Sequence, residues 1–141
     1  MKRSKTISIL SKGFIVLSGC ILLSVSLMAF RSPQQVMDMV GVSLPNTDAF
    51  SSIRGVYGGV GLTLFITLMY TLRKNVLQGL GLLTLLWGLY ALSRIITIFN
   101  EGSLGAFGTQ WLAIESVFFV TALTLLVLNR REYRLHRLAG S

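Results

Sequence analysis

The sequence is poor in the residues that build catalytic and metal sites. It has one cysteine, Cys20, so no intramolecular disulfide can form, and one histidine, His136. Only five residues are acidic, and charged residues make up 13% of the chain, about half their share in an ordinary soluble domain. No histidine–cysteine cluster has the spacing of a metal site, and no nucleophile lies beside a general base. These shortages indicate a non-enzymatic protein that holds no metal and no cofactor.

Apolar residues, in contrast, are abundant and form four long stretches. Hydrophobic residues make up 52% of the chain, and the stretches lie at 13–30, 55–72, 76–99 and 111–128. Each reaches or approaches the roughly 20 residues that an α-helix needs to cross a bilayer. The sequence therefore predicts an all-α fold, a four-span transmembrane antiparallel helix bundle that forms a single membrane domain over residues 1–141. Cys20 continues an apolar run, so we expect a buried helix cysteine.

The net charge of +8 is distributed unevenly over this arrangement. Four basic residues precede the first span, two separate the second from the third, and four lie in the tail 129–141. These ten of the thirteen basic residues fall on one side of the membrane: Lys2, Arg3, Lys5, Lys12, Arg73, Lys74, Arg130, Arg131, Arg134 and Arg137. Cytoplasmic loops carry such an excess of lysine and arginine. We therefore expect cytoplasmic N and C termini in the cell (inner) membrane, and no nucleic-acid partner.

The segment 31–52 between the first two spans contains signals for a short helix. Ser32 is expected to be the N-cap, Pro33 the first helical residue, and Gln35 the partner of Ser32 in a capping box. A glycine, Gly41, then ends the apolar side of the segment. The pattern predicts a short helix that either lies on the outer membrane surface or packs on the bundle. Asp48 or a following serine is expected to cap the second span.

Three charged residues lie within the predicted spans, where lipid cannot solvate them. Arg94 lies five residues before the end of the third span, and Glu115 lies about five residues after the start of the fourth. At 1.5 Å per residue both are roughly 7–8 Å below the outer surface, and Arg54 enters the second span from the same side. Tyr57 and Tyr90 lie at helical spacing from Arg54 and Arg94. These five residues form the predicted outer cluster.

This outer cluster has two positive charges and one negative charge. Ionisable residues within a membrane are functional candidates by default. One interpretation is a structural arginine–glutamate clamp that fixes helix packing. A second is a site for a small polar or anionic ligand or a lipid headgroup, and a third is a path for protons or ions.

Glycines mark faces on which helices can pack closely in lipid. The second span carries such a face, and the third has a sparser one: Gly55, Gly58, Gly59, Gly81 and Gly88. We expect these glycines to pack within the monomer, and a homodimer interface is the alternative.

The residues around the outer cluster also carry a family resemblance. The second span opens with the sequence Ile-Arg-Gly-Val-Tyr-Gly-Gly at 53–59, Ser-Arg-Ile-Ile follows at 93–96, and Asn-Glu-Gly at 100–102 precedes Glu115. Over about residues 10–130 the chain resembles an uncharacterised bacterial membrane family, domain of unknown function 4345. It is more weakly similar to DoxX-like membrane proteins. The resemblance implies a four-helix membrane bundle without an established activity, and the DoxX-like similarity implies accessory roles near quinone-linked enzymes.

Three functions are consistent with these features. The first is a non-enzymatic membrane protein that binds a small polar or anionic molecule through the outer cluster. The second is an accessory subunit of a larger membrane complex, which the small size and the lack of catalytic groups suggest. The third is a small transporter, although small multidrug exporters place their membrane glutamate in the first span, where this chain has none.

Overall fold

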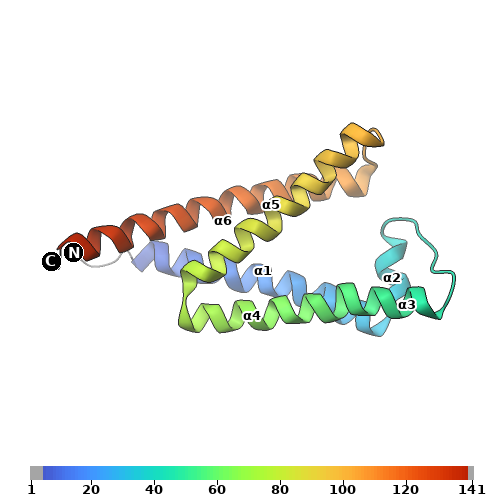
Figure 1. Ribbon diagram of the computed structural model, residues 1–141, viewed down its shortest axis with the longest axis horizontal. Helices are drawn as coiled ribbons and strands as arrows, with labels where there is room; N and C mark the ends of the chain where they lie inside the picture. Colours follow the sequence, from blue (N-terminus) through green and yellow to red (C-terminus); the bar gives the residue numbers. More distant parts are fainter. Residues whose placement is uncertain (1–4, 140–141) are drawn as a thin grey trace. The chain divides into compact units, whose positions relative to one another are not determined.

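The computed structural model describes residues 5–139, except for the side chains at 136, 137 and 139. Lys2 and Arg3, which we expected on the cytoplasmic side, lie outside the described residues, as does the side chain of Arg137. The described residues form helices and no strand, which confirms the all-α fold (Figure 1). In chain order the elements are α1 (Lys5–Arg31), α2 (Pro33–Asp38), α3 (Thr47–Ile53), the π-helix η1 (Arg54–Gly59), α4 (Val60–Lys74), α5 (Val76–Asn100) and α6 (Ala106–Ala139).

Four helical stretches are long and apolar enough to cross a membrane, as the sequence predicted. They cover Lys5–Arg31, Thr47–Lys74, Val76–Asn100 and Ala106–Leu135. Three of them start well before the predicted spans. The second is longer because α3, η1 and α4 follow one another without a break, and the fourth because α6 begins at Ala106, five residues before the predicted start.

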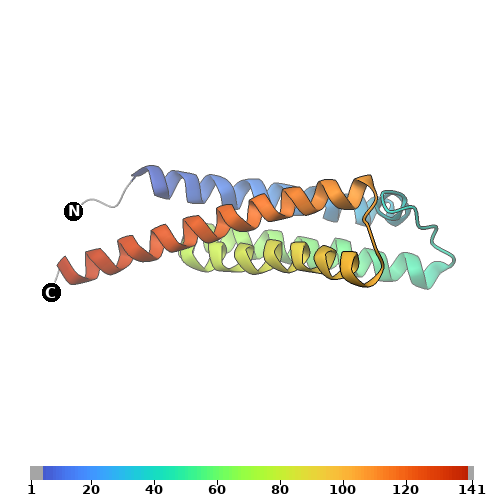
Figure 2. The same cartoon turned by 90° about the horizontal axis from the view of Figure 1, so that it is seen from above.

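The chain divides into two compact units, and the boundaries between them fall within α1 and within α4. The first unit comprises the described parts of residues 1–15 and 71–141, and the second comprises residues 16–70. In the first unit α5 and α6 pack against each other as an antiparallel hairpin joined by the loop 101–105 (Figure 2). Gly102 has a φ of 105°, a conformation that side chains with a Cβ rarely adopt, so a glycine suits this loop.

Aromatic rings from three helices form the core of the first unit. Phe14 of α1 meets Phe118 of α6 with ring centroids 5.4 Å apart, and Trp87 of α5 meets the same ring at 5.0 Å. Both contacts are edge-to-face, the arrangement that the ring quadrupoles favour. Phe118 thus contacts both other helices of this core, and its contact with Trp87 packs α5 against α6.

A buried polar contact joins α1 to α6 in the same unit. The Asn129 amide Nδ2 donates to the Ser11 hydroxyl at 2.8 Å and to the Leu125 carbonyl at 2.7 Å, and Ser11 in turn donates to the Ile7 carbonyl. Both Asn129 and Ser11 are fully buried. Hydrogen bonds of this kind hold helices together where lipid offers no partner.

The second unit contains the predicted short helix, now α2. Pro33 is its first residue and Gly41 follows it with a φ of 70°. Val36 and Met37 are buried and pack on Ala29 of α1. Of the two predicted alternatives, the structure therefore shows the helix that packs on other helices of its unit, and not one that only lies on the membrane surface.

Three local predictions in the second unit are wrong. Ser32 is the N-cap residue of α2, as predicted, but its side chain makes no capping hydrogen bond, so the predicted capping box with Gln35 is absent. Asn46, and neither Asp48 nor a later serine, caps the second membrane-length stretch, since its side-chain oxygen accepts from the Ala49 amide at 2.9 Å. Cys20 is exposed rather than buried.

The glycines divide into two groups. A Cβ added at Gly58 would lie 3.2 Å from the Phe30 ring, and one added at Gly88 would lie 2.8 Å from the Phe119 ring. Both glycines therefore pack closely against an aromatic ring, and a larger residue at position 88 would force a neighbour to shift. An added Cβ at the other three predicted packing positions would meet nothing within 4 Å: Gly55, Gly59 and Gly81. The structure therefore gives these three no close contact within their own units, and their role in helix packing stays a prediction.

Candidate functional site

Arg94 and Glu115 form a two-pronged ion pair across the α5–α6 hairpin. The Arg94 Nε donates to Glu115 Oε2 at 2.6 Å, and its Nη2 donates to Oε1 at 2.8 Å. Both carboxylate oxygens are therefore bound by one guanidinium. This is the geometry in which an arginine–carboxylate pair is strongest and most directional.

The hairpin places this pair near its connecting loop. Arg94 lies about two turns before the end of α5, and Glu115 lies between two and three turns after the start of α6. Because the helices run in opposite directions, these positions meet. The Glu115 side chain is 3% exposed and that of Arg94 is 25% exposed. The carboxylate is thus held inside the protein, and the arginine reaches it from a partly exposed position.

Burial decides what this pair contributes. An ion pair removed from water loses hydration energy that its mutual attraction only partly restores. The intact pair therefore adds little to the free energy of unfolding. Loss of one partner is costly, because it leaves the other charge uncompensated. In a membrane that cost enforces the register of α5 against α6.

Tyr90 lies one turn before Arg94 on α5. Its ring is 6.1 Å from that of Trp87 in an edge-to-face contact, and the residue is 44% exposed. Trp87 is almost fully buried. Tyr90 therefore borders the aromatic core of the first unit on the side nearer the ion pair.

Arg54 and Tyr57 belong to the second unit, where both lie on η1. The Arg54 Nε donates to the carbonyl of Phe30 at 3.3 Å, in the last turn of α1. The final carbonyls of a helix lack partners within it and carry partial negative charge, so a cation is favourable there. Arg54 thus caps α1, whereas Tyr57 is 40% exposed.

The sequence reasoning missed the π-helix that carries Arg54 and Tyr57. Such wider turns are rare and occur frequently at functional sites. The Ser26 hydroxyl of α1 donates to the Gly58 carbonyl in this turn at 2.6 Å, and the contact is buried. Three glycines among the six residues of η1 were the available signal, because glycine is a poor former of regular α-helix.

Of the five residues predicted in the outer cluster, the structure brings Arg94 and Glu115 into direct contact, with Tyr90 one turn away on the same helix. Arg54 and Tyr57 share a different element in the other unit. Among residues 5–139, no three histidine, cysteine, aspartate or glutamate side chains are grouped so that they could hold a metal ion.

Comparison with known proteins identifies the family. The family model described as "Domain of unknown function (DUF4345)" matches residues 10–126, well over half of the chain. Comparisons with curated proteins and with solved structures return no match. The matched region runs from α1 through most of the apolar part of α6 and includes the Arg94–Glu115 pair and η1. The chain therefore belongs to the DUF4345 family.

Proposed function

We propose that this chain is a non-enzymatic, multi-pass protein of the bacterial inner membrane with both termini in the cytoplasm. The four membrane-length helices support several crossings. The basic residues gathered near the ends of the spans support the orientation, because such residues are retained on the cytoplasmic side. A fluorescent protein fused after residue 141 should then fluoresce, and alkaline phosphatase fused there should be inactive. Active phosphatase at this position would contradict the orientation.

Within this protein, the Arg94–Glu115 pair locks the α5–α6 hairpin at its outer end. The support is geometric, since both oxygens of Glu115 accept hydrogen bonds from Arg94 and the carboxylate is almost fully buried. Both oxygens thus face one guanidinium, which directs the negative charge of Glu115 to Arg94. The pair is a structural clamp, in preference to an ion or proton path.

Arg54 and Tyr57 form the part of the outer cluster that binds a small polar or anionic ligand or a lipid headgroup. The observation that carries this proposal is the exposed positive charge of Arg54, for which the described second unit shows no ion-pair partner. Glu115 is committed to Arg94, whereas Arg54 is exposed and the structure gives it a single hydrogen bond, from Nε to a carbonyl, within the described second unit. Its two terminal nitrogens match the paired oxygens of a phosphate or carboxylate.

Native mass spectrometry of gently extracted full-length protein tests the ligand. The variants are Arg54→Gln and, as a matched control, Arg31→Gln, which removes the same charge from an exposed arginine at the end of α1. We expect an anionic mass on the wild type and on Arg31→Gln that Arg54→Gln has lost. A bound mass that survives in Arg54→Gln, or a bare wild-type chain, would refute the ligand site.

An accessory subunit of a larger membrane complex is the second candidate, and the open glycines favour it. Gly55 and Gly59 lie one turn apart and have no neighbour that an added Cβ would meet. A helix of a partner, or of a second copy, could approach this face closely. Gly55→Leu should then reduce cross-linking to that partner in native membranes, and Gly81→Leu is the control on another helix. Equal cross-linking of both variants would argue against this interface.

A further inference from the structure

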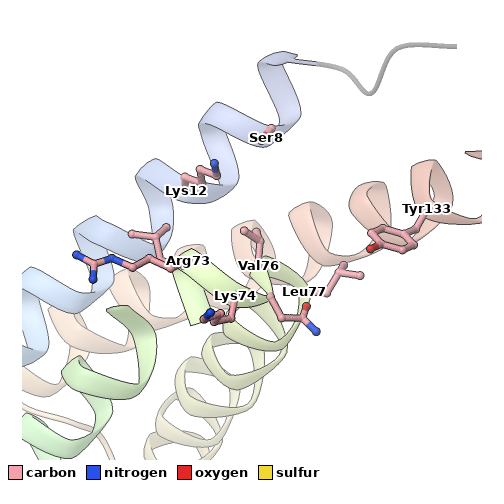
Figure 3. A pocket seen from close by; sticks show the side chains of 9 residues that line it. Ser8, Lys12, Arg73, Lys74, Val76, Leu77 and Tyr133 are labelled. Carbon is pink, nitrogen blue, oxygen red and sulfur yellow. The ribbon is translucent and has the colours of Figure 1, made fainter. Parts of the chain in front are cut away.

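A polar cavity of about 280 Å³ lies in the first unit, where α4 ends and α5 begins. It belongs to neither the ion pair nor η1. Figure 3 shows Lys12 on α1, Arg73 and Lys74 at the turn, and Tyr133 reaching from α6 toward that turn. The nine residues that line the cavity are Ser8, Lys12, Leu72, Arg73, Lys74, Asn75, Val76, Leu77 and Tyr133.

Charge of one sign dominates the lining. Lys12, Arg73 and Lys74 are basic and exposed, and none of the nine lining residues is acidic. Among residues 5–139, the structure gives none of these three an ion-pair partner. Glu132 directly precedes the lining residue Tyr133 on α6, but it does not line the cavity itself. Three like charges around one cavity repel one another, so an anion from outside the chain would lower the energy of this arrangement.

The remaining lining groups add hydrogen-bond donors. Asn75 caps α5, its side-chain oxygen accepting from the Gln78 amide at 3.3 Å, which leaves its NH₂ group available to a ligand. The backbone amides of Val76 and Leu77 lie in the first turn of α5, where no carbonyl of the same helix can accept from them. The hydroxyls of Ser8 and Tyr133 complete the lining. Several donors and three cations together match the oxygen atoms of a phosphate.

The position of the cavity matches the membrane surface. Leu72, Val76 and Leu77 belong to the apolar stretches of α4 and α5, whereas Arg73 and Lys74 belong to the turn between them. Basic pockets between membrane helices, at the cytoplasmic ends of the helices, bind anionic headgroups. The volume is near the lower end of ligand pockets, which span roughly 300–1,000 Å³, so it suits a headgroup rather than a large cofactor.

We propose that this cavity binds a phosphate group, carried by an anionic lipid headgroup or by a soluble phosphate compound. Lys12, Arg73 and Lys74 supply the charge, and the donors of Asn75 and of the first turn of α5 orient the oxygens. The site is independent of the outer cluster, because the two share no residue.

Titration of the purified full-length protein with phosphatidylglycerol, followed by native mass spectrometry, tests the site. The test variant is Arg73→Gln/Lys74→Gln. The matched control is Arg130→Gln/Arg131→Gln, which removes two exposed positive charges from α6 outside the lining. Phosphatidylcholine serves as the zwitterionic lipid, and inorganic phosphate serves as the soluble probe. Circular dichroism of each variant verifies that the helices are retained.

A cation near the membrane surface contributes about 1 kcal/mol, or roughly fivefold in affinity. We therefore expect the test variant to bind phosphatidylglycerol at least tenfold more weakly than the wild type. The control should lose at most about threefold, because its charges act only through the general field. Binding that inorganic phosphate does not displace assigns the site to a lipid headgroup, and direct binding of inorganic phosphate assigns it to a soluble compound. Equal losses in both variants, or equal affinity of the wild type for both lipids, would overturn the proposal.

Discussion

Arg94 of α5 and Glu115 of α6 are joined by two hydrogen bonds of 2.6 and 2.8 Å that occupy both oxygens of the carboxylate. Such a contact is intolerant of a shift along either helix, because sliding α5 by one residue moves the guanidinium about 1.5 Å and rotates it away from Glu115. The pair thus specifies the register of α5 against α6, and its two charges neutralise each other. Register control is the best-attested use of buried polar groups.

Replacement of Glu115 should destabilise the protein strongly. Glu115→Gln leaves the guanidinium of Arg94 without its counter-charge, and we expect a loss of about 3–5 kcal/mol in the free energy of unfolding. Unfolding by SDS in mixed micelles, followed by circular dichroism, measures this loss. Glu101→Gln is the control, since Glu101 is exposed in the loop after α5. Equal stability of the two variants would show that the pair does not hold the hairpin.

Gly88→Ala should be destabilising, and Gly81→Ala should not be. The added methyl at position 88 would lie 2.8 Å from the Phe119 ring, whereas the one at 81 would meet nothing within 4 Å. Overpacking of this kind costs about 1–3 kcal/mol. Gly81→Ala should be neutral or gain up to about 1 kcal/mol from helix propensity. Melting temperatures of both variants in the same detergent measure the contrast, and a reversed order would contradict the packing of Phe119 on α5.

Loss of the Asn129 amide should loosen α1 from α6. Asn129→Ala leaves the buried Ser11 hydroxyl without its donor, at a cost of about 1–3 kcal/mol. Asn100→Ala, at the exposed end of α5, is the control for removing an asparagine from a helix. Unfolding curves of the two variants would coincide if the buried contact contributed nothing.

Asn46 should control the start of the second membrane-length stretch. Asn46→Ala removes the acceptor of the Ala49 amide, which costs about 1 kcal/mol of local helix stability. Asp48→Asn should change it by only a few tenths, because the aspartate acts through the helix dipole alone. Hydrogen exchange at the amides of α3 reports the difference. Faster exchange in Asp48→Asn than in Asn46→Ala would return the cap to Asp48.

The sequence predicted the four membrane helices because length and hydropathy determine them, and the structure confirms all four. It also placed Arg94 and Glu115 at one depth, since a short loop between two helices leaves their positions little freedom. The caps were harder to predict. Asp48 has capping chemistry, but it lies inside α3, whereas Asn46 lies just before this helix with an extended backbone and presents its oxygen to Ala49.

Other features depend on tertiary structure that periodicity does not encode. The π-turn at Arg54–Gly59 places Arg54 at the end of α1, and no regular helical spacing predicts this contact. The contact between Ser11 and Asn129 joins residues 118 positions apart. The sequence does not distinguish an open glycine such as Gly55 from a packed one such as Gly58. The difference is that the ring of Phe30, on α1, lies against Gly58.

A double-mutant cycle at positions 94 and 115 tests the central claim most directly. Arg94→Gln, Glu115→Gln and the double variant are unfolded by SDS in the same micelles, and the coupling energy is the difference between the double loss and the two single losses. The clamp predicts a coupling of about 2 kcal/mol or more, because the double variant removes both charges of the pair and avoids the cost of leaving one alone. A coupling near zero would show that Arg94 and Glu115 act independently, which would contradict the lock.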